Sequence, residues 1–191
     1  EQIALCEAYA KEQGVWNDTC ERVYSKVLHL DLGTVERSIA GPSCPHDRIS
    51  WARAKDRFEV TCVERNLHKE NTVTVDIAGA EYELTHGALA IAAVTSCTTA
   101  TDPAMMLACG LLARNAAAAG LTPKPWVKTI LAPGSKATEL LLKRAGLADG
   151  LRKLGFYTCG FGCMSCIGNS GPLLDAMHEV ADEIELTSVL S

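Results

Sequence analysis

The sequence predicts an α/β fold in which helices flank a mostly parallel sheet, with a small β-containing part towards the N-terminus. The first observation is a continuous apolar run over residues 88–95, typical of a strand buried on both faces of a parallel sheet. The second is that helical and strand-like segments alternate after this run, as they do in layered α/β proteins.

The first 50 residues predict a helix and a connector. Residues 2–13 carry apolar side chains at helical spacing, which indicates a short amphipathic helix. The segment 31–47 has few periodic signals but contains Gly41-Pro42 and Pro45, so we expect a connector there.

Residues 51–191 are expected to form the α/β domain. Its first part is rich in β-branched and aromatic residues, which predicts strands at 57–63, 72–77 and 81–84, the last two joined through Gly79 as a hairpin.

Local signals mark the helices of the second half. Asp102 and Pro103 suit the N-cap and first turn of a helix that reaches Ala119, and Gly120 suits its end. The remaining elements expected are a strand at 126–131, a helix from the 133–135 turn to about 145, a short helix at 148–154 and a short strand at 156–159.

Composition is that of an ordinary globular protein, with 48% hydrophobic and 21% charged residues, so the chain has enough apolar surface for a core. The net charge of −5 argues against a nucleic-acid-binding face. The apolar stretch 88–94 is too short to cross a bilayer. No secretory signal opens the chain, and its first residue is Glu1, which hints at a processed chain or an excerpt.

Nine cysteines at irregular spacing do not resemble a disulfide framework. They favour a reducing compartment, the cytoplasm or an organelle matrix. Cys163-Met164-Ser165-Cys166 is a CxxC flanked by glycines, a spacing at which two thiolates can bind a metal or cluster. A zinc half-site and a redox pair remain open alternatives, although no second CxxC accompanies this one.

The position of Cys97 favours a cluster over the zinc and redox alternatives. It follows the buried strand at 88–95, just as Cys163 follows the expected strand at 156–159. The carboxyl ends of parallel strands line one crevice, so Cys97, Cys163 and Cys166 are expected to lie within one cluster's reach. Allowing for collapse of the loops, their three sulfur atoms should fall roughly within 5–8 Å of each other.

Two motifs resemble those of the aconitase family. Residues 92–98 (AAVTSCT) are similar to its first cluster-cysteine motif, and residues 160–172 (GFGCMSCIGNSGP) are similar to the second. Residues 124–128 (KPWVK) and 131–135 (LAPGS) match the intervening stretch. The first half, with Leu30-Asp31-Leu32, Gly41-Pro42 and 45–48 (PHDR), resembles the aconitase A branch, which includes iron regulatory proteins.

This resemblance implies a lyase of the tricarboxylic acid cycle that interconverts citrate and isocitrate through cis-aconitate. It implies that Cys97, Cys163 and Cys166 are the ligands of a [4Fe–4S] cluster, and that the substrate is a small tricarboxylic acid. It assigns no catalytic acid or base to this chain, because those residues belong to other domains of a larger enzyme. We therefore expect this segment alone to be inactive.

Two positions depart from the family pattern and leave alternatives open. Thr99 stands where the family commonly has Asn, and Asp102 where the aconitase A branch usually has a second Asn. A hydro-lyase specialised for methylcitrate or a phosphinomethylmalate is therefore one alternative. Others are an iron-regulatory RNA-binding protein, the one case with an RNA partner, and a zinc-binding module.

The other candidate groups are interpreted as bystanders. Isolated thiols commonly behave as small apolar residues, and isolated surface histidines are seldom catalytic. The residues concerned are Cys6, Cys20, Cys44, Cys62, Cys109, Cys159, His46, His86 and His178.

Overall fold

The computed structural model describes residues 1–16, 23–41, 44, 46–181, 183–184 and 187–190. The chain divides into two compact units, Glu1–Ala52 and Arg53–Ser191. Within the described ranges, no helix has the length and apolar character needed to span a membrane.

The first unit contains little regular structure. Its elements are α1 (Gln2–Glu12), the 3₁₀ turn η1 (Leu32–Thr34), β1 (Ser38–Ala40), β2 (Arg48–Ser50) and the start of η2 (Trp51–Arg53). The helix predicted at 2–13 is present as α1, but none of its residues is buried. The connector prediction was incomplete, because β1 and β2 form a short antiparallel pair within and beside it. Pro42 and Pro45, on which that prediction drew, lie outside the described residues.

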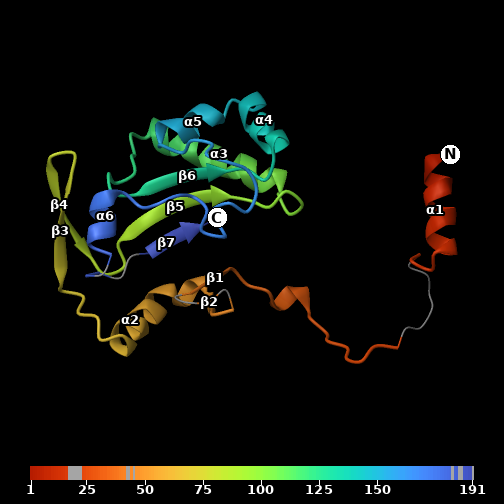
Figure 1. Ribbon diagram of the computed structural model, residues 1–191, viewed down its shortest axis with the longest axis horizontal. Helices are drawn as coiled ribbons and strands as arrows, with labels where there is room; N and C mark the ends of the chain where they lie inside the picture. Colours follow the sequence, from red (N-terminus) through yellow and green to blue (C-terminus); the bar gives the residue numbers. More distant parts are fainter. Residues whose placement is uncertain (17–22, 42–43, 45, 182, 185–186, 191) are drawn as a thin grey trace. The chain divides into compact units, whose positions relative to one another are not determined.

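The second unit carries the rest of the elements (Figure 1). They are α2 (Ala54–Glu64), β3 (Thr72–Ile77), β4 (Ala80–Thr85), β5 (Leu89–Thr95), α3 (Pro103–Ala118), β6 (Lys128–Ala132), α4 (Lys136–Arg144), α5 (Ala148–Lys153), α6 (Asp175–Glu179) and β7 (Thr187–Leu190).

The described residues form three small sheets, two antiparallel and one parallel. β3 and β4 make the expected hairpin, and Gly79 turns it with a φ of +83° while its N–H donates to the Asp76 carboxylate at 2.8 Å. The parallel sheet has the order β6-β5-β7. The prediction of mixed helices and strands is confirmed, whereas parallel pairing among the described residues occurs in this three-stranded sheet and in one isolated bridge.

One element was predicted wrongly. Residues 57–63 were expected to form a strand, but they lie in α2, where Thr61 and Cys62 are buried. Asp56 lies in the first turn, where a negative charge interacts favourably with the helix dipole. Arg57 and Glu64 form an ion pair at 3.1 Å along the same helix. Strand propensity is a weak preference that such local and tertiary interactions override.

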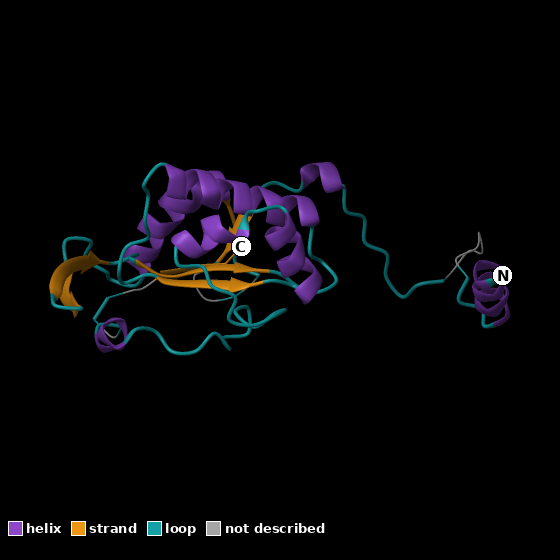
Figure 2. Ribbon diagram, turned by 90° about the horizontal axis from the view of Figure 1, so that it is seen from above, coloured by secondary structure: helices purple, strands orange, loops and turns teal. Residues whose placement is uncertain are grey.

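The parallel sheet is covered on one face by helices, as Figure 2 shows. Val94 of β5 and Leu131 of β6 pack there against Met106 of α3 and Leu142 of α4, among other residues. Ala93, Ile130 and Ala132 point to the opposite face, where they form a second cluster. Both faces of β5 and β6 are therefore apolar, as the continuous run in the sequence indicated.

The short strand expected at 156–159 is reduced to a single parallel bridge between Thr158 and Leu131. Its backbone still bonds to β6, since the Leu131 N–H donates to Tyr157 at 3.1 Å and the Cys159 N–H donates to Leu131 at 3.1 Å. The segment that leads to Cys163 therefore enters beside β6 and runs in the same direction.

Candidate functional site

Cys97 lies two residues beyond the end of β5, in the loop that leads to α3. The start of α3 is fixed by the Asp102 carboxylate, which accepts from the Ala104 N–H at 2.9 Å, and by Pro103 in the first turn. The N-cap prediction is thus confirmed, and Asp102 has a structural role. The loop also folds back on itself, because the Thr101 hydroxyl donates to the Cys97 carbonyl at 2.5 Å.

Three loops meet beyond the carboxyl ends of β5, β6 and the Thr158 segment. The Thr98 hydroxyl donates to the Gly134 carbonyl at 2.6 Å, which joins the first loop to the one after β6. The Gly162 N–H donates to the Pro133 carbonyl at 2.8 Å, which joins that second loop to the CxxC loop. Pro133, which accepts one of these hydrogen bonds and precedes the acceptor of the other, is fully buried, so packing holds this part of the second loop in place.

The structure brings two of the predicted ligands into direct contact. The Sγ atoms of Cys97 and Cys163 are 3.0 Å apart, although the residues are separated by 66 positions. Both are free thiols and either can be the donor. This pair is closer than the 5–8 Å expected, an expectation that had allowed for collapse of the loops.

Cys166 interacts electrostatically with Cys163. The pKa of the Cys163 thiol is raised, first by its hydrogen bond with Cys97 and by the charge of Cys97, then by burial and by the charge of Cys166. Like charges placed close together disfavour ionisation, so one thiolate makes the next harder to form. A bound cation would relieve this repulsion.

The CxxC forms a compact turn and does not open a helix. The Ile167 N–H donates to the Cys163 carbonyl at 3.2 Å, and the Asn169 N–H donates to the Met164 carbonyl at 2.9 Å. Gly162 and Gly168 flank the turn with φ values of +76° and +77°, a region that side-chain-bearing residues seldom adopt. A redox CxxC usually lies at the start of a helix, so this geometry favours ligation over redox chemistry.

The donor set fits an iron–sulfur cluster. Thiolates are the ligands such clusters use, and Cys163 and Cys166 are both exposed. In the part of the chain that the structure describes, no three His, Cys, Asp or Glu side chains gather closely enough to hold a single metal ion. Ser165, between the two cysteines, is 7% exposed, and its hydroxyl has no hydrogen-bond partner among the described residues.

Among the described residues of the second unit, the other cysteines and histidines form no metal-binding group with these loops. Cys6 and Cys159 are exposed, Cys44 and Cys109 are partly buried, and Cys62 is buried. Cys159 is turned towards β6, since its Sγ lies 3.5 Å from the Leu131 carbonyl oxygen. Cys20 lies outside the described residues. His46 and His178 are exposed, and His86, which is partly buried, lies between β4 and β5.

Sequence reasoning missed two residues that support the CxxC loop. Met164 was given no role of its own, but it packs against the cluster of Ala93, Ile130 and Ala132. Lys128 was counted as part of a strand, but its ammonium group binds two backbone carbonyls of the loop, those of Ser170 and Pro172. A charged residue in an otherwise apolar strand was the available signal.

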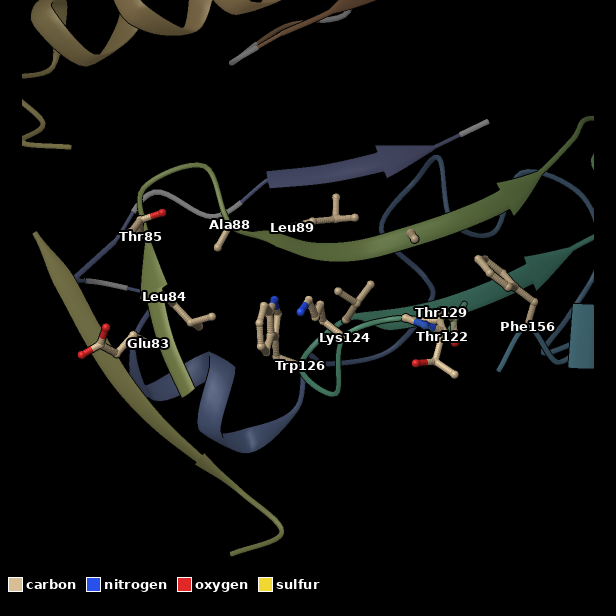
Figure 3. A pocket seen from close by; sticks show the side chains of 13 residues that line it. Glu83, Leu84, Thr85, Ala88, Leu89, Thr122, Lys124, Trp126, Thr129 and Phe156 are labelled. Carbon is tan, nitrogen blue, oxygen red and sulfur yellow. The ribbon is translucent and has the colours of Figure 1, made fainter. Parts of the chain in front are cut away.

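A cavity of about 470 Å³ lies elsewhere in the second unit (Figure 3). It is bounded by the end of β4, the start of β5 and the segment before β6, with Trp126 and Lys124 side by side in it. The Lys124 ammonium lies 5.9 Å from the Trp126 ring centre. None of the three predicted ligand cysteines lines this cavity.

The fold and the loops together define an α/β protein with cysteines gathered at the carboxyl ends of its parallel strands. The model of the aconitase family (aconitate hydratase) matches residues 1–190. The chain therefore belongs to the aconitase family.

Its relatives include proteins named aconitate hydratase A. Those of Legionella pneumophila, Bradyrhizobium diazoefficiens and Escherichia coli are 46%, 45% and 42% identical over 99%, 100% and 98% of this chain. The matched regions make up 22%, 22% and 21% of those proteins. The chain thus spans about a fifth of the length of these curated relatives.

Proposed function

We propose that this chain is the cluster-binding part of an aconitate hydratase, in which Cys97, Cys163 and Cys166 hold a [4Fe–4S] cluster. The observation that carries the proposal is the 3.0 Å contact between the sulfur atoms of Cys97 and Cys163, which come from loops far apart in the sequence. Cys166 supplies the third thiol from the same turn as Cys163.

Three protein ligands leave one iron of such a cluster open. When bound, the cluster would supply a Lewis acid that polarises a substrate hydroxyl and carboxylate. The chain's own residues hold the ligands in place: the Gly162–Pro133 bond joins the CxxC loop to the loop after β6, and the Thr98–Gly134 bond joins the Cys97 loop to that same loop. Rigid support of this kind is needed if ligand geometry is to be maintained during turnover.

The substrate we propose is a small tricarboxylic acid, with citrate and isocitrate interconverted through cis-aconitate. Removing water from such an acid also needs a base positioned at the proton to be abstracted. No residue of this chain is assigned that role, and we propose that it comes from other domains of the same enzyme. Residues 1–191 alone are expected to be inactive.

The organisation proposed for the segment follows from the same reasoning. Residues 51–191 would act as the α/β cluster-binding domain, with the parallel sheet of β5, β6 and β7 as part of a larger mostly parallel sheet, and residues 1–50 as helix and connector. The free cysteines suit a reducing compartment, and we propose the cytoplasm.

The alternatives receive less support. Thr99, which motivated a hydro-lyase specialised for a citrate analogue, lies exposed in the loop before α3. The relatives reported above are named aconitate hydratase A. We therefore favour aconitate hydration over the analogue-specific, RNA-binding and zinc-binding alternatives.

The test is ligand substitution in the full-length enzyme. Replacing Cys163 or Cys166 with Ser should abolish cluster absorbance, bound iron and citrate turnover together, because a hydroxyl oxygen is a harder and poorer ligand than a thiolate. Replacing Cys159 or Cys109 with Ser should preserve all three, at a stability cost of about 1 kcal/mol. A Cys159 variant that loses iron as the Cys163 variant does would contradict the ligand set, and zinc in place of iron would contradict the cofactor.

A further inference from the structure

We propose that Lys128 is a positioning residue for the cluster loop: its ammonium group fixes the backbone that follows Cys166 and so holds the CxxC in its ligating conformation. This inference rests on the proposed function. It concerns a residue outside both cysteine motifs.

The contacts are specific. Lys128 is the first residue of β6, and its Nζ donates to the carbonyl oxygens of Ser170 and Pro172, each at 2.6 Å. Gly171 lies between these two acceptors with a φ of +83°, and a Cβ added there would lie 3.5 Å from the ammonium nitrogen. The backbone over 170–172 therefore curves around the cation. Hydrogen bonds from a charged donor are shorter and roughly twice as strong as neutral ones.

Lys128 lies at the end of β6 that is opposite the cysteine loops. Lys128 pairs with Ile91, whereas Ala132, at the other end of β6, pairs with Thr95 beside the cysteine loops. At about 3.3 Å per residue, these two ends of β6 are roughly 13 Å apart. The chain that leaves Cys166 thus returns along the sheet and is held at the far end of β6 by Lys128.

Besides the buried Ser165, the other anchors of the loop lie at its two ends. Cys163, Cys166 and Ile167 are exposed, so burial of their side chains does little to fix them. At the cysteine end, Met164 packs on the sheet and Gly162 bonds to Pro133. At the other end, the Lys128 ammonium, which has no carboxylate partner among the described residues, bonds the backbone just before Leu173, whose side chain packs against a core cluster that includes Met177. We call the two hydrogen bonds from the Lys128 ammonium to Ser170 and Pro172 the clamp. Cys166 therefore lies between the Met164 contact and the clamp.

The test uses the full-length enzyme with Lys128→Met, which keeps much of the side chain's length but removes its charge and donors. Lys128→Arg, which keeps a cation with several donors, is the rescue variant. Lys153→Met, at an exposed position on α5, is the matched control. Two quantities are measured: the rate at which the reconstituted cluster loses iron to a chelator, and hydrogen exchange of backbone amides over 163–171 in the apo-protein.

Lys128→Met should lose iron roughly ten-fold faster than wild type, the size of effect typical of groups that support metal ligands. Its amides over 163–171 should also exchange faster, while peptides from α3 and α4 remain unchanged. Lys128→Arg should restore both quantities towards wild type, and Lys153→Met should alter neither.

Unchanged iron loss and unchanged exchange in Lys128→Met would overturn the inference. So would faster exchange spread evenly over the second unit, because Lys128 would then stabilise the fold as a whole. The exchange measurement needs no cluster, so it tests the clamp even if wild-type enzyme binds no iron, a result that would instead refute the proposed function.

Discussion

Gly134, in the turn after β6, offers a direct test of how the loops hold Cys97. A Cβ at this position would lie 2.6 Å from the Cys97 carbonyl oxygen and 3.0 Å from its carbonyl carbon, and it would also overlap the Thr101 hydroxyl. Ordinary contacts of this kind are about 3.5–4 Å, so in Gly134→Ala the Cys97 loop must move by roughly 0.5–1 Å. Overpacking of this kind typically costs about 1–3 kcal/mol.

Two assays on the apo-protein separate stability from geometry. Urea unfolding under reducing conditions should show a free energy of unfolding lower by about 1–3 kcal/mol in Gly134→Ala. Disulfide formation between Cys97 and Cys163, driven by the two-electron oxidant diamide, should be slower than in wild type. The two sulfur atoms, now 3.0 Å apart, must approach to about 2.05 Å to bond, and displacement of the Cys97 loop makes that approach harder.

Gly146→Ala is the matched control. Gly146 ends α4 with a φ of +68° and has no neighbour within 4 Å of an added Cβ, so alanine there adds backbone strain without a steric clash. That strain costs about 1–2 kcal/mol, similar to the expected effect at Gly134. Cross-linking should nevertheless stay at the wild-type rate. Our reasoning fails if Gly134→Ala cross-links as fast as wild type, or if Gly146→Ala slows cross-linking equally.

Further predictions concern three other positions. Thr99→Asn in the full-length enzyme should keep the cluster absorbance and alter the preference between citrate and its analogues, since a polar group beside a site affects substrate orientation more than cluster assembly. An unchanged preference would show that the departure from the family is neutral. Gly150→Ala should destabilise the protein by about 1–3 kcal/mol in urea unfolding, because its Cβ would lie 2.7 Å from the Arg114 Cα on α3; an unchanged midpoint would contradict this packing. Burial raises the pKa of the Cys109 thiol, so iodoacetamide should modify it more slowly than exposed Cys6 at neutral pH, and equal rates in the folded protein would be evidence against that burial. The folded state therefore holds the Cys109 thiol proton more tightly than the unfolded state does. The contribution of this proton to the free energy of unfolding is fully present below the ordinary thiol pKa and is lost as pH rises through the raised pKa. Unfolding measured at several pH values would show this loss.

What could be predicted from the sequence was largely local. Asp102 and Gly120 mark the ends of α3 through interactions within a few residues, and the structure has that helix at Pro103–Ala118. Gly79 likewise marks the hairpin of β3 and β4. The apolar run at 88–95 predicted β5 because a strand covered on both faces needs apolar side chains on both.

What could not be predicted depends on contacts between distant parts of the chain. The helix α2 replaced a predicted strand because the β-branched residues of 57–63 express only a weak preference. The strand β7 was missed, and it adds to β5 from nearly a hundred residues further along the chain. The meeting of Cys97 with Cys163 was expected from their places after strands, but no pattern in the sequence could give its distance.

The supports of the two cysteine loops differ in kind, and this difference bears on which substitutions should matter. Cys97 follows a strand with neighbours on both sides, so the sheet itself limits its position. Cys163 and Cys166 lie in a turn without helix or strand, and their positions depend on a few contacts made by Gly162, Met164 and Lys128. Loss of one such contact removes a larger share of the support than loss of one contact in the sheet. The ligating geometry should therefore be most sensitive to substitutions at residues that pack or bond the CxxC loop, including one on β6 that lies outside both cysteine motifs.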